Sequence, residues 1–193
     1  MLASDLSLEV QVPRHHTQAF SQYVVIGAAA KEILRSLLEA SQYKVYPFGY
    51  ESSLSSLKMH IWDSHIQDSN AVERVRSMPD YVVSSEKGLK LVEVKFRKRS
   101  DREGHPGFYL KNKDLNRYRL YWTESVIALI SPYGDRFFCQ DVNNLIPGSQ
   151  DSKWFGYDEF QSLGDIYPET RDKLRAFGVA VDKLGTLWDE QKA

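Results

Sequence analysis

The sequence predicts a mixed α/β (α+β) protein with a central mixed sheet flanked by helices. Three observations carry this prediction: an amphipathic helical pattern near the start, paired strand patterns in the middle, and a wholly apolar strand-like run that follows a second helical pattern. Helices that alternate with strands in this way are typical of a sheet covered by helices. The length of 193 residues predicts one compact domain over 1–193.

The first helix is expected over residues 18–40. Its apolar residues recur at helical spacing and form one broad stripe, made up of Phe20, Tyr23, Gly27, Ala30, Leu34, Leu37 and Leu38. Residues 43–50 alternate and are rich in aromatic residues, which predicts a strand, and Pro47 indicates a sheet edge or a bulge. Residues 51–77 are interpreted as a helical insert.

The middle of the chain predicts a hairpin, a helix and two more strands. Residues 81–85 and 89–97 form the hairpin around a turn at 86–88, and a loop containing Gly104, Pro106 and Gly107 follows. A helix is then expected over 112–122, a buried strand over 125–131 and another strand over 136–142. An aromatic and helical extension occupies about 150–193, with its last helix from 168 to 188.

Composition excludes several classes of protein. The 25 basic and 26 acidic residues give a net charge of −1, which argues against uniform coating of nucleic acid, and the longest apolar run is far below the roughly 20 residues that span a bilayer. The start of the chain lacks a signal-peptide pattern, and Cys139 is the single cysteine. We therefore expect a cytoplasmic protein with no membrane association. No glycine-rich phosphate loop is present, so no nucleotide cofactor is expected.

Three charged residues in the predicted hairpin carry the functional hypothesis. Glu93 and Lys95 point to the same face of their strand, and a short hairpin can bring Asp80 across from them. Two converging carboxylates repel unless a cation separates them, and oxygen ligands suit Mg²⁺ or Mn²⁺. A neighbouring lysine can orient a water or stabilise developing phosphorane charge. The alternative interpretation is a solvated charge pair and an ordinary turn aspartate.

Pro79-Asp80, followed by Glu93-Val94-Lys95, resembles the signature of the PD-(D/E)XK nuclease superfamily, which includes type II restriction enzymes and archaeal-type Holliday-junction resolvases. The order of elements over about 18–140 also resembles that family's αβββαβ core. The resemblance implies that Asp80, Glu93 and the backbone carbonyl of Val94 bind Mg²⁺ or Mn²⁺. It also implies that Lys95 is the catalytic lysine.

One further acid is expected from the resemblance, and the sequence departs from the pattern there. Many family members carry a glutamate four residues after a glycine in the first helix, whereas Lys31 stands at that spacing after Gly27. Glu32, next to it, is a tentative catalytic candidate, although helical phase places it nearly opposite the apolar stripe. Glu51 is the other candidate, and a second metal site is in doubt.

A basic segment begins at Lys95. Residues 95–119 carry a local charge of +6, which leaves −7 on the remainder. Such a run is usually a solvated face, but here it could meet phosphates beside the metal. Phe108 and Tyr109 lie within it and could stack on bases. The predicted DNA contacts are Arg97, Lys98, Arg99 and Lys113, the last of which resembles a family position that faces the site from the following helix.

These observations predict a Mg²⁺-dependent DNA endonuclease. Cutting both strands of a duplex with one site per chain needs two chains, so a homodimer is a further hypothesis. The competing hypothesis is a catalytically silent module that binds nucleic acid or a protein partner, and an RNA substrate is not excluded. The sequence leaves open whether cleavage is sequence-specific or structure-specific.

Overall fold

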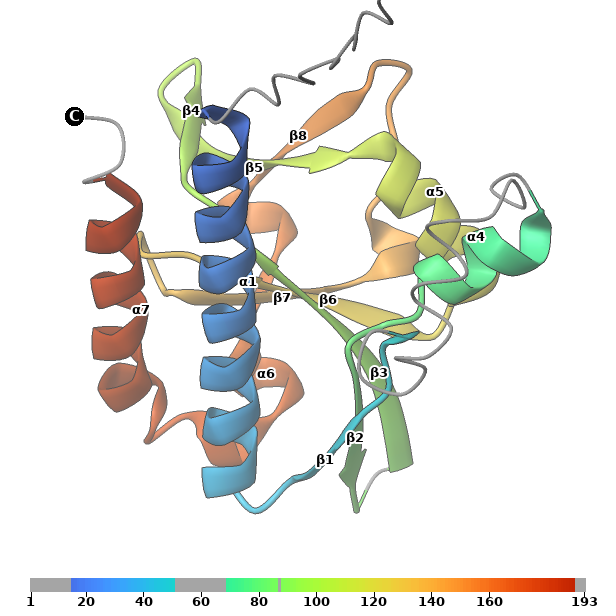
Figure 1. Cartoon of the computed structure of the whole chain (residues 1–193). Helices are drawn as coiled ribbons and strands as arrows, with labels where there is room; N and C mark the ends of the chain where they lie inside the picture. The colour runs from blue at the N-terminus through green and yellow to red at the C-terminus, as the bar shows by residue number, and fades with distance from the viewer. Residues whose placement is uncertain (1–14, 51–68, 87, 190–193) are drawn as a thin grey trace, which may run out of the picture.

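The computed structural model describes residues 15–50, 69–86 and 88–189. At the centre of the molecule lies a six-stranded mixed sheet (Figure 1). The strand order is β1-β2-β3-β6-β7-β9, and β3 pairs with β6 in parallel while all other neighbours are antiparallel. The strands are β1 (Lys44–Pro47), β2 (Tyr81–Ser85), β3 (Gly88–Phe96), β6 (Ser125–Ile130), β7 (Phe137–Asp141) and β9 (Gln161–Ser162).

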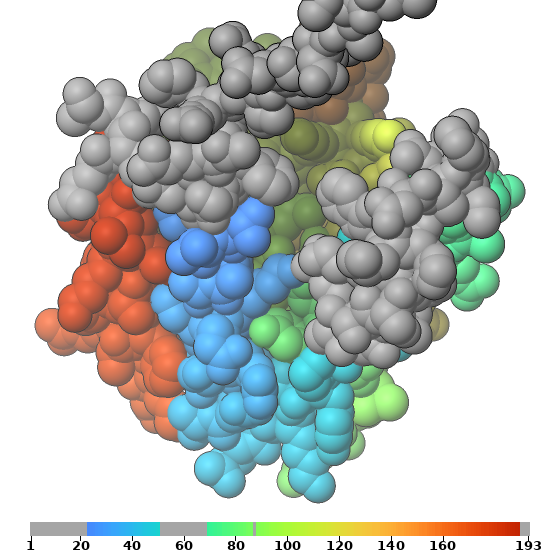
Figure 2. Space-filling model, in the orientation of Figure 1, coloured from blue at the N-terminus to red at the C-terminus, as the bar shows by residue number. Residues whose placement is uncertain are grey.

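Two long helices cover one face of this sheet. The helices α1 (His15–Ala40) and α7 (Leu174–Asp189) lie side by side, as Figures 1 and 2 show, and the short α6 (Leu163–Ile166) lies near them. Leu34, Leu37 and Leu38 of α1 are fully buried against alternate residues of β3 and β6. The apolar stripe predicted for the first helix is therefore its core-facing side.

The opposite face packs on α5 (Asn112–Tyr121) and on a second, three-stranded sheet. This sheet has the order β4-β5-β8 and consists of β4 (Ser100–Arg102), β5 (His105–Lys111) and β8 (Ser152–Gly156). Its buried residues Phe108, Leu110 and Phe155 form a second core with residues of β6 and β7. The two cores thus lie on opposite faces of the same six-stranded sheet.

The second sheet corrects two predictions. The segment with Gly104, Pro106 and Gly107 is a hairpin and not a loop, because Glu103 and Gly104 both have positive φ, at 54° and 83°, and make a two-residue turn between β4 and β5. Pro106 is tolerated because it precedes the part of β5 that pairs with β8, which begins at Gly107, so it is paired on one side alone. The expected aromatic tail likewise includes β8, which pairs with β5.

Most of the other predicted elements are confirmed. The mixed α/β class, the hairpin, the helix at 112 and the two strands after it appear within two residues of the expected bounds, and Pro47 ends the edge strand β1. The first helix begins three residues earlier than expected. Of the insert, α4 (Asn70–Arg76) is helical and residues 51–68 lie outside the described part of the chain.

The end of the chain differs from the prediction. Residues 168–170 form a short 3-10 turn, as do Val142–Asn144 and Tyr157–Glu159. The last helix therefore begins at Leu174 and not at 168. Within the described residues no helix combines the length and apolar character needed to cross a bilayer.

Two helical glycines differ in their surroundings, which predicts opposite effects of alanine. A Cβ at Gly185 of α7 would lie 2.4 Å from Cβ of Pro132, whereas one at Gly27 of α1 would meet nothing within 4 Å. We expect Gly185→Ala to lower the free energy of unfolding by about 1–3 kcal/mol through overpacking. Gly27→Ala should raise it by about 0.5–1 kcal/mol, because alanine loses less backbone entropy in a helix. Urea unfolding of both variants tests this, and equal effects would contradict the packing of α7 on Pro132.

Candidate active site

The candidate site lies where β2 begins and β3 continues beyond it. Tyr81 pairs with Val92, so the next position in this register places Asp80 opposite Glu93. On its other side β3 runs parallel to the fully buried β6, with Glu93 beside Ile127 and Lys95 beside Leu129. The three predicted residues are therefore brought together by one hairpin in the centre of the sheet.

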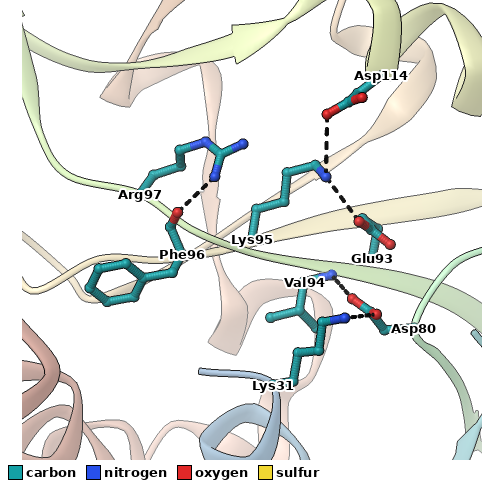
Figure 3. Close-up of polar contacts among 8 residues, drawn as sticks. All are labelled: Lys31, Asp80, Glu93, Val94, Lys95, Phe96, Arg97 and Asp114. Atoms are coloured by element: carbon teal, nitrogen blue, oxygen red, sulfur yellow. Dashed lines mark hydrogen bonds and ion pairs between the residues drawn. The ribbon is translucent and has the colours of Figure 1, made fainter. Parts of the chain in front are cut away.

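Asp80 is held from two sides. Its Oδ2 accepts a hydrogen bond of 2.9 Å from the backbone N–H of Val94, and its Oδ1 lies 2.5 Å from Nζ of Lys31, which reaches it from α1 (Figure 3). Burial, followed by the neighbouring Glu93 carboxylate, raises the pKa of Asp80 to about 7. Lys31 and the Val94 N–H act in the opposite direction, but they do not outweigh these two causes.

Glu93 is paired with Lys95 inside the fold. The Lys95 Nζ lies 2.9 Å from Oε1 of Glu93 and 3.6 Å from Oδ2 of Asp114 on α5 (Figure 3), and it faces the ring of Tyr118 at 5.5 Å. The Tyr118 hydroxyl donates a hydrogen bond to the Glu93 carboxylate. Burial, followed by this carboxylate, raises the pKa of Tyr118. Lys95 is thus fixed between two carboxylates, with its side chain only 15% exposed.

A cavity of about 560 Å³ opens over these groups. Sequence reasoning missed several of its walls: Lys31 and Arg35 from α1, Arg76 at the end of α4, and Asp114 and Tyr118 from α5. For α5 the signal was that Asp114 and Tyr118 share one face of a helix at the spacing of four residues. For α1 it was the family spacing after Gly27, which leads to Lys31, although a lysine was not expected to act there.

Glu32 also lines the cavity, but it is not held at its centre. Its side chain is 62% exposed and its Oε2 lies 3.8 Å from Arg35 of the same helix. The structure therefore places Lys31, and not Glu32, against Asp80. Glu51, the other candidate acid, lies outside the described residues.

The four predicted DNA contacts are dispersed. Arg97 comes directly after β3 and donates a hydrogen bond of 2.8 Å to the carbonyl of Phe96, and burial lowers its pKa. Lys98 pairs with Asp189 of α7, and Arg99 with Asp101 at 2.6 Å. Lys113 is exposed and lines a separate groove of about 520 Å³ beside α5, so Asp114 takes the place that we expected for Lys113.

The two aromatic residues of the basic segment, Phe108 and Tyr109, differ in exposure. Phe108 is fully buried in the second core and packs on Phe138 and Tyr157, so the prediction that it stacks on bases is wrong. Tyr109, its neighbour on β5, points the other way and is 47% exposed. The alternation of a strand explains the difference.

The donor set suits a hard divalent cation. Asp80 and Glu93 supply carboxylate oxygens from facing strand positions, and their mutual repulsion is what a bound cation would relieve. The described residues contain no group of three or more His, Cys, Asp or Glu side chains arranged to hold a metal ion. Mg²⁺, however, is commonly held by one or two carboxylates together with waters and substrate phosphates. Two carboxylates at this place therefore fit the ion.

Comparisons with known proteins give a likeness to a solved structure. No protein-family model matches the chain, and no curated protein matches it. A solved structure that matches is that of Archaeoglobus fulgidus Hjc, described as a Holliday junction resolvase from an archaeal hyperthermophile. It is 13% identical, the match covers 74% of this chain and 95% of that one, and the TM-score is 0.46. The residues of the site itself therefore carry the functional proposal.

The raised pKa of Asp80 predicts a specific dependence of stability on pH. The folded chain retains the Asp80 proton up to about pH 7, whereas an unfolded aspartate loses it near pH 3.9. The contribution of the protonated Asp80 side chain to stability is therefore complete below about pH 4 and is lost as the pH rises through 7. The side chain of the Asp80→Asn variant cannot ionise. We therefore expect the free energy of unfolding of this variant, relative to that of the wild type, to rise by a few kcal/mol between pH 4 and pH 7.

Urea unfolding of both proteins between pH 4 and pH 8, without divalent ions, measures this difference. Asp165→Asn is the control, because Asp165 is an exposed partner of Arg171 and should leave the profile of the wild type unchanged. Parallel profiles of the wild type and Asp80→Asn would contradict the assignment.

Proposed function

We propose that this chain is a metal-dependent DNA endonuclease that hydrolyses phosphodiester bonds at the Asp80–Glu93–Lys95 site. The observation that carries the proposal is the convergence of Asp80, Glu93 and Lys95 at a single cavity, with Glu93 and Lys95 in the part of β3 that also supplies the core residues Val92, Val94 and Phe96. Charged side chains are rarely buried in this way without a chemical reason. The mixed sheet flanked by helices, with its α-β-β-β-α-β order of core elements, agrees with the resemblance drawn from the sequence.

In this proposal Asp80, Glu93 and the carbonyl of Val94 hold Mg²⁺ or Mn²⁺. When bound, the ion supplies positive charge for the scissile phosphate and lowers the pKa of a water. Lys95 orients the attacking water and stabilises the negative charge that develops on the phosphorus oxygens. Glu93 and Asp114 hold the Lys95 ammonium in place, and Tyr118 keeps Glu93 from turning away.

The same proposal covers the domain organisation, the oligomeric state and the location of the protein. We treat residues 1–193 as one domain, because both hydrophobic cores share the six-stranded sheet. Two chains would act on the two strands of a duplex as a homodimer. A cytoplasmic location is consistent with the buried thiol of Cys139, and RNA remains a possible substrate class.

The first test is cleavage by the site variants. We expect the wild type to nick plasmid DNA in Mg²⁺ or Mn²⁺ and not in EDTA. Glu93→Gln and Lys95→Met should reduce the rate at least about a hundredfold, because each removes a group that acts in the transition state. Lys90→Met is the matched control, since Lys90 lies exposed on the same strand.

The substrate panel contains linear duplex, a four-way junction and single-stranded RNA. Cleavage at the wild-type rate by either site variant would refute the site assignment. Binding to DNA without metal-dependent cleavage of any substrate would favour the catalytically silent module.

The second test measures phosphate contacts through salt dependence. We plot the logarithm of the association constant for DNA against the logarithm of the salt concentration, which gives a negative slope. We expect Lys113→Ala and Arg99→Ala each to make this slope less steep by about 1, as loss of one phosphate contact does. Lys98→Ala should have a smaller effect, because the Lys98 side chain is 23% exposed against 44% for Arg99 and is therefore less accessible to phosphates. Binding is measured in EDTA, and Lys183→Ala on the exposed side of α7 is the control. Unchanged slopes for Lys113→Ala and Arg99→Ala would remove both from the DNA interface.

A further inference from the structure

Each carboxylate of the site has its own lysine. Lys95 pairs with Glu93 from the next position on the same face of β3, whereas Lys31 pairs with Asp80 from α1 (Figure 3). The contact between Lys31 Nζ and Asp80 Oδ1 is 2.5 Å, and the Lys31 side chain is 36% exposed. Lys31 is therefore part of the cavity wall and not a solvated residue of the helix.

The backbone that carries Lys31 is firmly anchored. Ala30, directly before it, and Leu34, one turn later, are fully buried against the sheet. The ammonium group can turn at the end of its side chain, but its Cα cannot move away from Asp80 without disturbing this core. The positive charge beside Asp80 is thus a fixed property of the fold.

The charges within the site leave room for one divalent ion. The central cluster has three negative charges, from Asp80, Glu93 and Asp114, and two positive ones, from Lys31 and Lys95, while on the cavity rim Arg35 and Arg76 outweigh Glu32 by one further positive charge. One divalent ion takes this cluster from −1 to +1, whereas two would take it to +3 in a largely buried place, where unbalanced charge is costly. Glu32, the nearest additional acid on α1, is directed to Arg35.

From this arrangement we infer that Lys31 is a built-in cation that takes the place of a second metal ion beside Asp80, so that the site binds a single divalent ion. The inference rests on the proposed function, because it concerns the same carboxylates. It assigns Lys31 a positioning role: the residue holds Asp80 through an ion pair and supplies a positive charge that does not dissociate.

The test counts Mn²⁺ ions per chain by equilibrium dialysis, with electron paramagnetic resonance reporting the free ion. The wild type should bind one Mn²⁺. Lys31→Glu replaces the cation with a third carboxylate next to Asp80 and should bind two. Lys31→Met removes the charge without adding a ligand and should bind one Mn²⁺ on the order of tenfold more tightly, because a repelling charge is gone. Lys183→Glu makes the same charge change on α7 and should behave as the wild type.

The outcomes separate the inference from the proposed function. Two Mn²⁺ ions in the wild type, or one in a folded Lys31→Glu variant, would overturn the inference and leave the metal-dependent nuclease in place. No Mn²⁺ in the wild type would overturn both. Circular dichroism establishes folding, and if Lys31→Glu fails to fold, the affinity of Lys31→Met decides: an affinity equal to that of the wild type would overturn the inference.

Discussion

The site depends on the alternation of side chains along β3. Val92, Val94 and Phe96 face α1 and form the first core, while Glu93 and Lys95 between them face the opposite side. A shift of one residue in the pairing of β3 with β2 or β6 would bury the charges in the first core and expose the valines. The register that holds the hydrophobic core together therefore also determines where the charged groups lie.

The same register creates an electrostatic problem, which the neighbouring elements reduce. Asp80 and Glu93 face each other across the hairpin, and burial of Asp80, followed by this repulsion, raises its pKa. Removing charged groups from water costs several kcal/mol per ion unless partners compensate. Lys31 and Lys95 are those partners, and each comes from an element that is itself anchored by apolar packing. The ion pairs therefore keep two buried carboxylates compatible with the fold.

The sequence was sufficient to predict what depends on local periodicity. The hairpin, the buried run at β6 and the convergence of Asp80 with Glu93 all follow from alternation and from a short turn. The second sheet was missed because β4 has only three residues, β5 contains Pro106 and Gly107, and their turn uses a non-glycine residue, Glu103, at positive φ. The contact between Lys31 and Asp80 was missed for another reason. The family spacing after Gly27 leads to position 31, but it predicts a glutamate there, and the ion pair of a lysine with Asp80 depends on how α1 packs across the sheet.

The second sheet also explains why α5 can take part in the site. Leu115 and Tyr118 of α5 are buried together with Phe108, Leu110 and Phe155, so the helix is held by a core that does not include α1. Asp114 and Tyr118 consequently approach Lys95 and Glu93 from the face opposite to Lys31. A side chain held from two independently packed faces has little freedom to rotate, and precise placement of this kind is what a group acting in a transition state requires. The second sheet and α5 are therefore the support on which the orientation of Lys95 depends.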